Sequence, residues 1–230
     1  MLKIGNSIAV RLQRIGSEQQ PILIVDNVLD DPDAMIAEAS SANWYTPEHT
    51  HYPGKNARLP DAYYRTVVTA LRGPLEAAFG VSASAYLKYF GFFAMATTQA
   101  AHAEPIQKVP HHDSCDPERL SMIHYLCRAS FGGTGFFRHL STGYESISLE
   151  RHERYVASVA SELRQLPAAA GYAGQDSSGY ELIGAVECVF NRLIVYRSHV
   201  LHSALLGNAE LHADPMQGRL TANGFVEVAR

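Results

Sequence analysis

The feature that most constrains the fold is a series of short apolar segments in the last two thirds of the chain. Each segment is rich in β-branched and aromatic residues, and turn-forming residues separate it from the next. Many short strands joined by turns are typical of a β-sandwich or a jelly-roll barrel. The sequence therefore predicts a mainly β fold with flanking helices. The six predicted strands cover residues 85–98, 119–127, 134–139, 180–190, 192–198 and 219–228.

Helices are expected mainly in the N-terminal third, after a β-branched strand that begins at residue 21. Asp31 followed by Pro32 is a typical helix start, because aspartate caps free N–H groups and proline fits the first turn. Residues 51–60 are rich in turn formers. The predicted helices cover about 31–41, 61–79 with a break at Gly73-Pro74, and 149–166; those within about 31–80 are expected to pack on the barrel.

The 230 residues carry no internal repeat and no low-complexity linker, so we expect a single domain over 1–230. The net charge of −4 and the lack of a Lys/Arg run argue against nucleic acid or a membrane surface as partner. The N-terminus lacks the apolar core of a signal peptide, and the three cysteines are widely spaced. These features predict reduced thiols and a cytoplasmic location. Exposed edge strands would allow a homodimer.

The stretch KVPHHDSC, residues 108–115, concentrates metal-ligating side chains. On an extended segment His111 and Asp113 point to one face and His112 to the other. A third ligand must then come from elsewhere, and both His199 and His202 follow a β-rich run. Two histidines and one carboxylate form the facial triad of non-haem Fe(II) oxygenases, which leaves positions open for a co-substrate and O2. The alternative is a solvated polar loop.

A dicarboxylate co-substrate such as 2-oxoglutarate would need a buried cation, and arginine binds carboxylates with two parallel hydrogen bonds. Arg219 in GRLTANGF is a candidate, with Thr221 on the same strand face. Tyr125 offers a phenol on the strand that follows the His-x-Asp motif. Each residue also has a simpler interpretation: Arg219 as a surface arginine and Tyr125 as a core tyrosine.

Together these motifs resemble the Fe(II)/2-oxoglutarate-dependent oxygenases, in particular the prolyl-hydroxylase-like branch. The resemblance rests on the ordered set YPGKNARLP, VPHHDS, GGTGFFRH, NRLIVYRSHVLHSALL and GRLTANGF, which is similar to an uncharacterised bacterial family with this fold. It implies a double-stranded β-helix, with His111, Asp113 and His202 as the Fe(II) ligands. It also implies that Arg219 binds 2-oxoglutarate, assisted by Tyr125 and Thr221. The long gap before Arg219 leaves Arg138, Arg192 and Arg197 as alternative cations.

The activity that the resemblance implies is hydroxylation of an amino acid, a peptide or a small metabolite, coupled to conversion of 2-oxoglutarate and O2 to succinate. Two other classes stay open: a non-catalytic cupin-like metal- or ligand-binding protein, and a metal-dependent hydrolase. We expect structural or ligand-supporting roles for His112, His124 and His139, and an ordinary turn at Gly132-Gly133. The aromatic segment 43–60, with Trp44 and Tyr52, is expected to lie over the barrel mouth and contact substrate.

Overall fold

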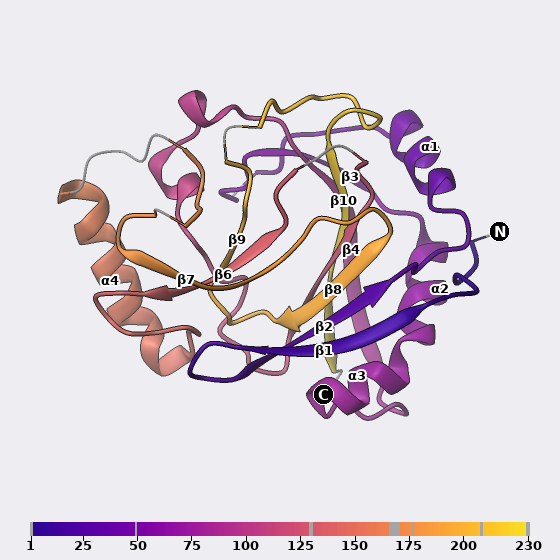
Figure 1. Ribbon diagram of the computed structural model, residues 1–230, viewed down its shortest axis with the longest axis horizontal. Helices are drawn as coiled ribbons and strands as arrows, with labels where there is room; N and C mark the ends of the chain where they lie inside the picture. Colours follow the sequence, from indigo (N-terminus) through magenta and orange to yellow (C-terminus); the bar gives the residue numbers. More distant parts are fainter. Residues whose placement is uncertain are drawn as a thin grey trace.

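The computed structural model describes residues 2–48, 50–128, 131–165, 171–175, 177–207 and 209–228. Its ten strands form two antiparallel sheets, so the fold is mainly β as predicted (Figure 1). The larger sheet has the order β1 (Ala9–Ile15), β2 (Gln20–Asp26), β8 (Arg192–Arg197), β5 (Leu120–Tyr125), β10 (Arg219–Val228), β4 (Leu87–Ala96) and β3 (Gly54–Arg58). The smaller has the order β7 (Tyr180–Val186), β6 (Thr134–His139) and β9 (His202–Ala204).

Four α-helices flank the sheets: α1 (Asp33–Ser41), α2 (Asp61–Ala70), α3 (Arg72–Phe79) and α4 (Leu149–Gln165). Two short 3₁₀ turns, Ala100–His102 and Pro105–Lys108, precede residues 111–115, which we call the HHDSC segment. In Figure 1 the first three helices lie at the right of the molecule and α4 lies at the far left, beside the smaller sheet. None of the helices in the described ranges is long and apolar enough to cross a membrane.

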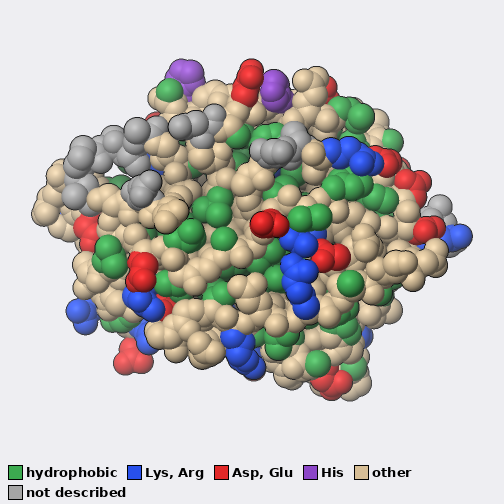
Figure 2. All heavy atoms as spheres, viewed as in Figure 1, with side chains coloured by type: hydrophobic (Ala, Val, Ile, Leu, Met, Phe, Trp, Pro, Cys, Tyr) green, Lys and Arg blue, Asp and Glu red, His purple; other side chains and the backbone are tan. Residues whose placement is uncertain are grey.

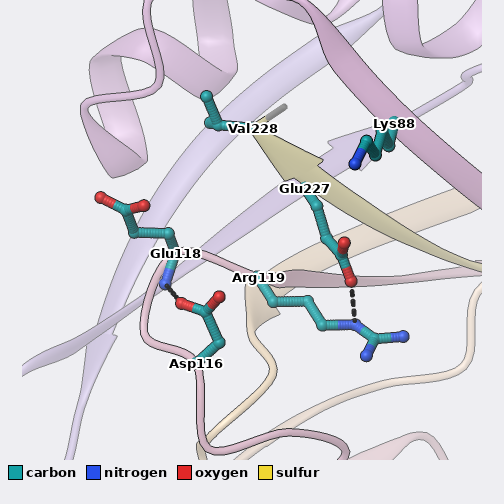
Figure 3. A pocket seen from close by; sticks show the side chains of 6 residues that line it. All are labelled: Lys88, Asp116, Glu118, Arg119, Glu227 and Val228. Carbon is teal, nitrogen blue, oxygen red and sulfur yellow. Dashed lines mark hydrogen bonds and ion pairs between the residues drawn. The ribbon is translucent and has the colours of Figure 1, made fainter. Parts of the chain in front are cut away.

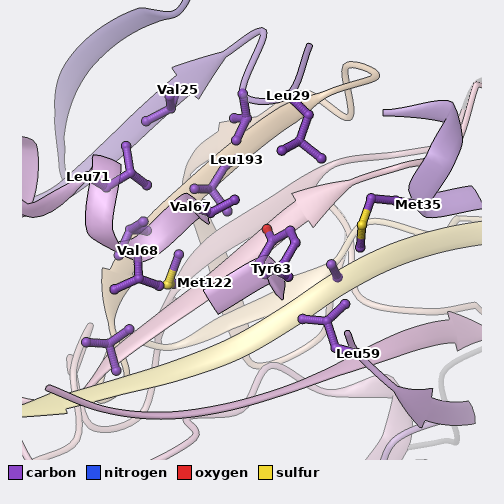
Figure 4. Close-up of a cluster of buried hydrophobic side chains, with 14 of the residues drawn as sticks. Val25, Leu29, Met35, Leu59, Tyr63, Val67, Val68, Leu71, Met122 and Leu193 are labelled. Atoms are coloured by element: carbon purple, nitrogen blue, oxygen red, sulfur yellow. The ribbon is translucent and has the colours of Figure 1, made fainter. Parts of the chain in front are cut away.

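The central strands of the larger sheet are buried on both faces, because their residues alternate between two cores. One core fills the space between this sheet and α1, α2 and α3, where Tyr63 and Val67 of α2 meet Leu193 and Met122 (Figure 4). The other core lies between the two sheets, where the rings of Phe136 and Tyr196 pack edge to face with centroids 5.2 Å apart. The helices therefore stabilise the sheet from outside and leave its inner face to the smaller sheet.

The same alternation decides which residues of β10 face inward. Leu220, Ala222 and Val226 belong to the core beneath the helices. Arg219 and Thr221, one residue out of step, therefore face the smaller sheet. Thr221 lies directly opposite Tyr125 on β5, so these two predicted residues share one level of the inner face.

The sequence predictions were incomplete in three places. The sheets stay separate in the described part of the chain, so the predicted barrel is not closed; β9 has three residues, and β6 is the one strand of the described sheets that pairs with it. Residues 51–60 are not all turn, since β3 occupies Gly54–Arg58 and pairs with β4. The second helix breaks at Leu71, and Pro74 falls in the first turn of α3, where its missing N–H is not needed.

Two other details of the helix predictions can be compared with the structure. The first helix begins at Asp33, although Asp31 still accepts a hydrogen bond of 3.2 Å from the N–H of Ala34. Residue 166, the predicted end of the last helix, lies outside the described residues.

The structural roles predicted for His124 and His139 fit their contacts. His124 is fully buried between the Tyr63 hydroxyl, 3.0 Å from Nδ1, and the Asn191 amide oxygen, 3.1 Å from Nε2. His139, also fully buried, contacts Glu162 at 3.0 Å. Both rings thus use their nitrogens within the fold.

On the face that Figure 2 shows, acidic and basic side chains are interspersed and form no large patch of one sign.

Candidate metal centre

The two histidines of the candidate centre are held side by side by the backbone. The HHDSC segment runs beside β9, and His111 and His202 form an isolated antiparallel bridge. Each N–H donates to the other residue's carbonyl, at 2.9 and 2.8 Å. Residues paired in this way place their side chains on the same side, and the two imidazole rings lie 4.4 Å apart between centroids.

Asp113 completes the group from two residues further along. Its Oδ1 lies 3.7 Å from Nε2 of His111, and its Oδ2 lies 3.5 Å from Nε2 of His202. The three donor atoms all lie within 4.8 Å of one another, so one metal ion could contact them all. The structure thus brings His202, rather than His199, to His111 and Asp113.

Two serines hold the Asp113 carboxylate in place. Ser121 at the start of β5 donates a hydrogen bond of 2.6 Å to Oδ2 of Asp113. The Ser121 hydroxyl also lies 2.7 Å from that of Ser198, which must be the donor because Ser121 has already used its one proton. The N–H of Asp113 donates to the carbonyl of Ser198 at 2.8 Å. Sequence reasoning missed both serines, because nothing in their local sequence marks them.

The tautomer of His202 suits a metal ligand. Its Nδ1 lies 2.9 Å from the carbonyl of Val200, and a carbonyl can only accept, so Nδ1 carries the proton. In the neutral ring Nε2 then has a free lone pair, and this is the nitrogen that faces Asp113. A backbone carbonyl that fixes the ring in this way is typical of histidines that bind metals.

The protonation states also favour a cation. Partial desolvation lowers the pKa of His111, and the nearby His202 lowers it further. Burial alone would raise the pKa of Asp113, but His202, His111 and the Ser121 hydroxyl together hold it below its usual value. At neutral pH Asp113 is therefore a carboxylate and His111 a neutral imidazole, the forms that bind metals. The His111 side chain is 57% exposed and that of His202 only 6%, so the centre is open on the His111 side.

Arg219 is a buried cation on the inner face of the larger sheet, which faces the smaller sheet. The residue is only 4% exposed, and its guanidinium donates to the carbonyls of Gly132 and Gly133 at 3.4 and 3.2 Å. Within the described residues it forms no ion pair with a carboxylate. A buried charge without a counter-charge is costly, so a guanidinium in this state indicates a site for an anionic ligand.

The alternative arginines are less suitable. Arg138 pairs with Glu145 and Glu181, and Arg192 pairs with Asp26. Arg197 is only half-buried and donates to the carbonyls of Pro117 and Phe79. Of these four arginines, Arg219 alone is both buried and without a carboxylate partner among the described residues.

The Gly132-Gly133 pair is more than an ordinary turn. A side chain on Gly132 would meet the carbonyl oxygen of Leu205 at 1.6 Å, and one on Gly133 would meet that of Val186 at 1.7 Å. Only glycine allows this close approach, which also aims the two carbonyls at Arg219.

Tyr125 and Thr221 lie beside Arg219, but their hydroxyls already have protein partners. The Tyr125 hydroxyl is 2.7 Å from that of Thr134, and Thr221 donates to the carbonyl of Ala94 at 3.3 Å. The Arg219 guanidinium lies 5.7 Å from the centre of the Tyr125 ring. Each hydroxyl could still accept a further hydrogen bond.

Tyr52 lies near Arg219, and its predicted contact with substrate stays a prediction. Gly54 of β3 and Arg219 of β10 both pair with Ala96 of β4, which brings the chain around Tyr52 close to Arg219. The Tyr52 hydroxyl is buried and has no hydrogen-bond partner. Burial raises the pKa of Tyr52, and the charge of nearby Arg219 partly offsets that rise. Tyr52 therefore presents an unused donor near the cation.

Trp44 lies elsewhere, and the prediction that it contacts substrate is wrong. Its ring packs against Phe93 in the core beneath the helices, and its N–H donates to the carbonyl of Ala39 at 2.9 Å. The charged pocket in Figure 3 is also separate, since none of the candidate ligands lines it; Arg119 and Glu227 form an ion pair of 3.1 Å there.

The fold is one that 2-oxoglutarate-dependent enzymes share. HygX from Streptomyces hygroscopicus, with nickel and 2-oxoglutarate bound, superposes with a TM-score of 0.53 at 12% identity, covering 92% of this chain and 84% of that chain. SnoK, a non-haem α-ketoglutarate-dependent carbocyclase from nogalamycin biosynthesis, gives 0.51 at 10% identity, covering 92% and 81%. These likenesses concern the fold alone.

The chain itself belongs to a family of unknown function, DUF6445, which it matches over residues 6–226. No match was found among curated proteins. A Pseudomonas putida prolyl-4-hydroxylase superposes with a TM-score of only 0.40 at 13% identity, covering 86% of this chain and 100% of that chain, so the resemblance to that branch stays a prediction.

Proposed function

We propose that this protein is an Fe(II)- and 2-oxoglutarate-dependent oxygenase with a double-stranded β-helix. The observation that carries the proposal is an open His₂-Asp group together with a buried arginine that has no carboxylate partner among the described residues. A metal site alone would fit several classes of protein. The unpaired arginine adds a second requirement, for an anionic ligand that reaches into the interior.

The residues fit the metal that the fold implies. His111, Asp113 and His202 would hold Fe(II), since two imidazoles and one carboxylate with open positions suit this ion, whereas zinc more often takes three ligands and a water or a closed set of four. Ser121 keeps the carboxylate oriented, and the carbonyl of Val200 keeps His202 in the ligating tautomer. When bound, Fe(II) supplies the centre at which 2-oxoglutarate and O2 react to give succinate and an oxidised substrate.

The other residues act on the co-substrate. Arg219 would bind the distal carboxylate of 2-oxoglutarate, because its fork of N–H groups matches a carboxylate and its charge lacks a counter-ion. Tyr52 would donate the hydrogen bond that its hydroxyl lacks in the protein alone. Tyr125 and Thr221 would line the side of this pocket and assist through a bridging water, because an ionised carboxylate has no proton to donate to them.

The reaction that we propose is hydroxylation of an amino acid, a peptide or a small metabolite. The exposed side of His111 is the direction from which such a substrate would reach the centre. The net charge of −4 supports a small or peptidyl substrate rather than nucleic acid.

The test is an anaerobic titration with Fe(II) and then 2-oxoglutarate, followed through the weak visible charge-transfer band of the chelate. We expect the band in the parent protein and its loss in His111→Ala and Asp113→Ala. His102→Ala removes a histidine of a 3₁₀ turn outside the centre and is the matched control. Turnover is then measured as succinate formed in air.

Two outcomes would contradict the proposal. If iron binds but 2-oxoglutarate gives no band and no succinate, the protein is better described as a cupin-like metal-binding protein. If the band persists in both ligand variants, the His₂-Asp group is not the iron site.

A further inference from the structure

The HHDSC segment carries ligand-type side chains on two sides. His111 and Asp113 face β9 and the centre described above, whereas His112 and Cys115 face α4. There they meet His152, which lies in the first turn of α4. The second group shares no residue with the first and has no part in the proposed oxygenase chemistry.

The distances within this second group match those of a metal site. The Cys115 sulfur lies 3.6 Å from Nε2 of His112 and 3.4 Å from Nδ1 of His152. In a tetrahedral zinc site with Zn–S of about 2.3 Å and Zn–N of about 2.0–2.1 Å, the sulfur and nitrogen ligands stand about 3.6 Å apart. All three donor atoms of the group lie within 4.8 Å of one another.

Hydrogen bonding accounts less well for this arrangement. A thiol carries one proton, so Cys115 can donate to only one of the two imidazoles, and sulfur is a weak acceptor for the other. The two rings stand edge to face with centroids 5.4 Å apart, which leaves both nitrogens directed at the sulfur side. A cation among the three donors would satisfy all of them together.

We propose that His112, Cys115 and His152 form a second metal site, for a divalent transition ion that takes thiolate and imidazole, with Zn²⁺ as the expected type. The fourth position would hold water, since His152 is exposed and the other two residues are only half-buried. Binding breaks the S–H bond and forms a sulfur–metal bond, and the proton passes to solvent. The ion would tie the segment that holds His111 and Asp113 to α4.

Cobalt(II) is the probe that separates the two sites, because thiolate bound to Co²⁺ gives an intense near-ultraviolet charge-transfer band. The His₂-Asp group contains no sulfur and cannot produce it. We expect the band when Co²⁺ is added to the full-length protein, and its displacement by Zn²⁺. Asp113→Ala should keep the band, so this test is independent of the proposed function.

Variants then assign the ligands. Cys115→Ser should abolish the band, and His152→Ala should weaken Co²⁺ binding at least tenfold. His152 is exposed on α4, so its replacement leaves the fold intact. Cys188→Ser is the matched thiol control and should retain the band. No band in the parent, a band that survives Cys115→Ser, unchanged affinity in His152→Ala, or loss of the band in Cys188→Ser would each overturn the proposal.

Discussion

Replacement of Arg219 by methionine separates co-substrate binding from folding. Arg219 is 4% exposed, and within the described residues its guanidinium donates to two backbone carbonyls, so a carboxylate bound there would form a desolvated, doubly hydrogen-bonded ion pair. Removing one partner of such a pair costs about 2–5 kcal/mol. For a loss of about 3 kcal/mol, within this range, 2-oxoglutarate should bind roughly 150-fold more weakly.

The same substitution should not lower the stability of the ligand-free protein. An uncompensated buried charge costs several kcal/mol, and methionine fills a similar volume without it. We therefore expect an unchanged or higher Tm together with the loss of affinity.

The assay is the 2-oxoglutarate titration of the Fe(II) protein, beside thermal unfolding without ligand. Arg219→Lys keeps the charge but loses the fork, and should give an intermediate affinity. Arg58→Ala, which changes an exposed arginine on β3, is the control. Unchanged 2-oxoglutarate affinity in Arg219→Met would refute the reasoning.

Three further predictions follow from contacts near the site and in the core. Ser121→Ala removes the hydrogen bond to Asp113 and should weaken Fe(II) binding about 10- to 100-fold, as measured by metal titration; an unchanged affinity would show that Ser198 alone orients the carboxylate. Tyr52→Phe removes a hydroxyl that has no partner in the protein, so Tm should hold while 2-oxoglutarate affinity falls about tenfold, the loss of roughly 1.4 kcal/mol; a lower Tm with unchanged affinity would place the hydroxyl in the core instead. Burial lowers the pKa of His124 in the folded protein to about 4. Between pH 6.5 and pH 4 this histidine is therefore protonated in the unfolded chain but still neutral in the folded protein, which favours unfolding. Stability should then fall by about 2 kcal/mol between pH 7 and pH 5 in urea unfolding, and by less in His124→Gln; an equal fall in both would exclude His124 as the cause.

Local patterns predicted the elements that carry strong periodic signals. Each of the six predicted strand segments contains a strand, because β-branched and aromatic residues at alternate positions suit a sheet buried on one or both faces. β3 escaped prediction, because Gly54, Lys55 and Asn56 have little strand propensity and the segment is held by its pairing with β4. β1 escaped because its residues are nearly all exposed at the edge of the sheet.

The residues of the candidate site also fall into those that a local pattern predicts and those that depend on long-range contacts. Alternation along an extended segment indicated that His111 and Asp113 share a face, and the structure brings their side chains together. Spacing could not choose between His199 and His202, because the choice depends on the backbone bridge between His111 and β9. The contacts of Ser121 and Tyr52 likewise depend on strand register between distant parts of the chain, which no local pattern contains.

The backbone bridge between His111 and His202 has a consequence for the order of events during synthesis. His111 and Asp113 leave the ribosome long before His202, and two of three ligands make a poor site. The complete donor set exists only once β9 has joined β6 and the HHDSC segment lies beside it. Iron would therefore bind late, to a chain that is already nearly folded, and its binding would stabilise only the correct long-range pairing. The nascent protein would then not hold a redox-active ion in an incomplete, solvent-filled site.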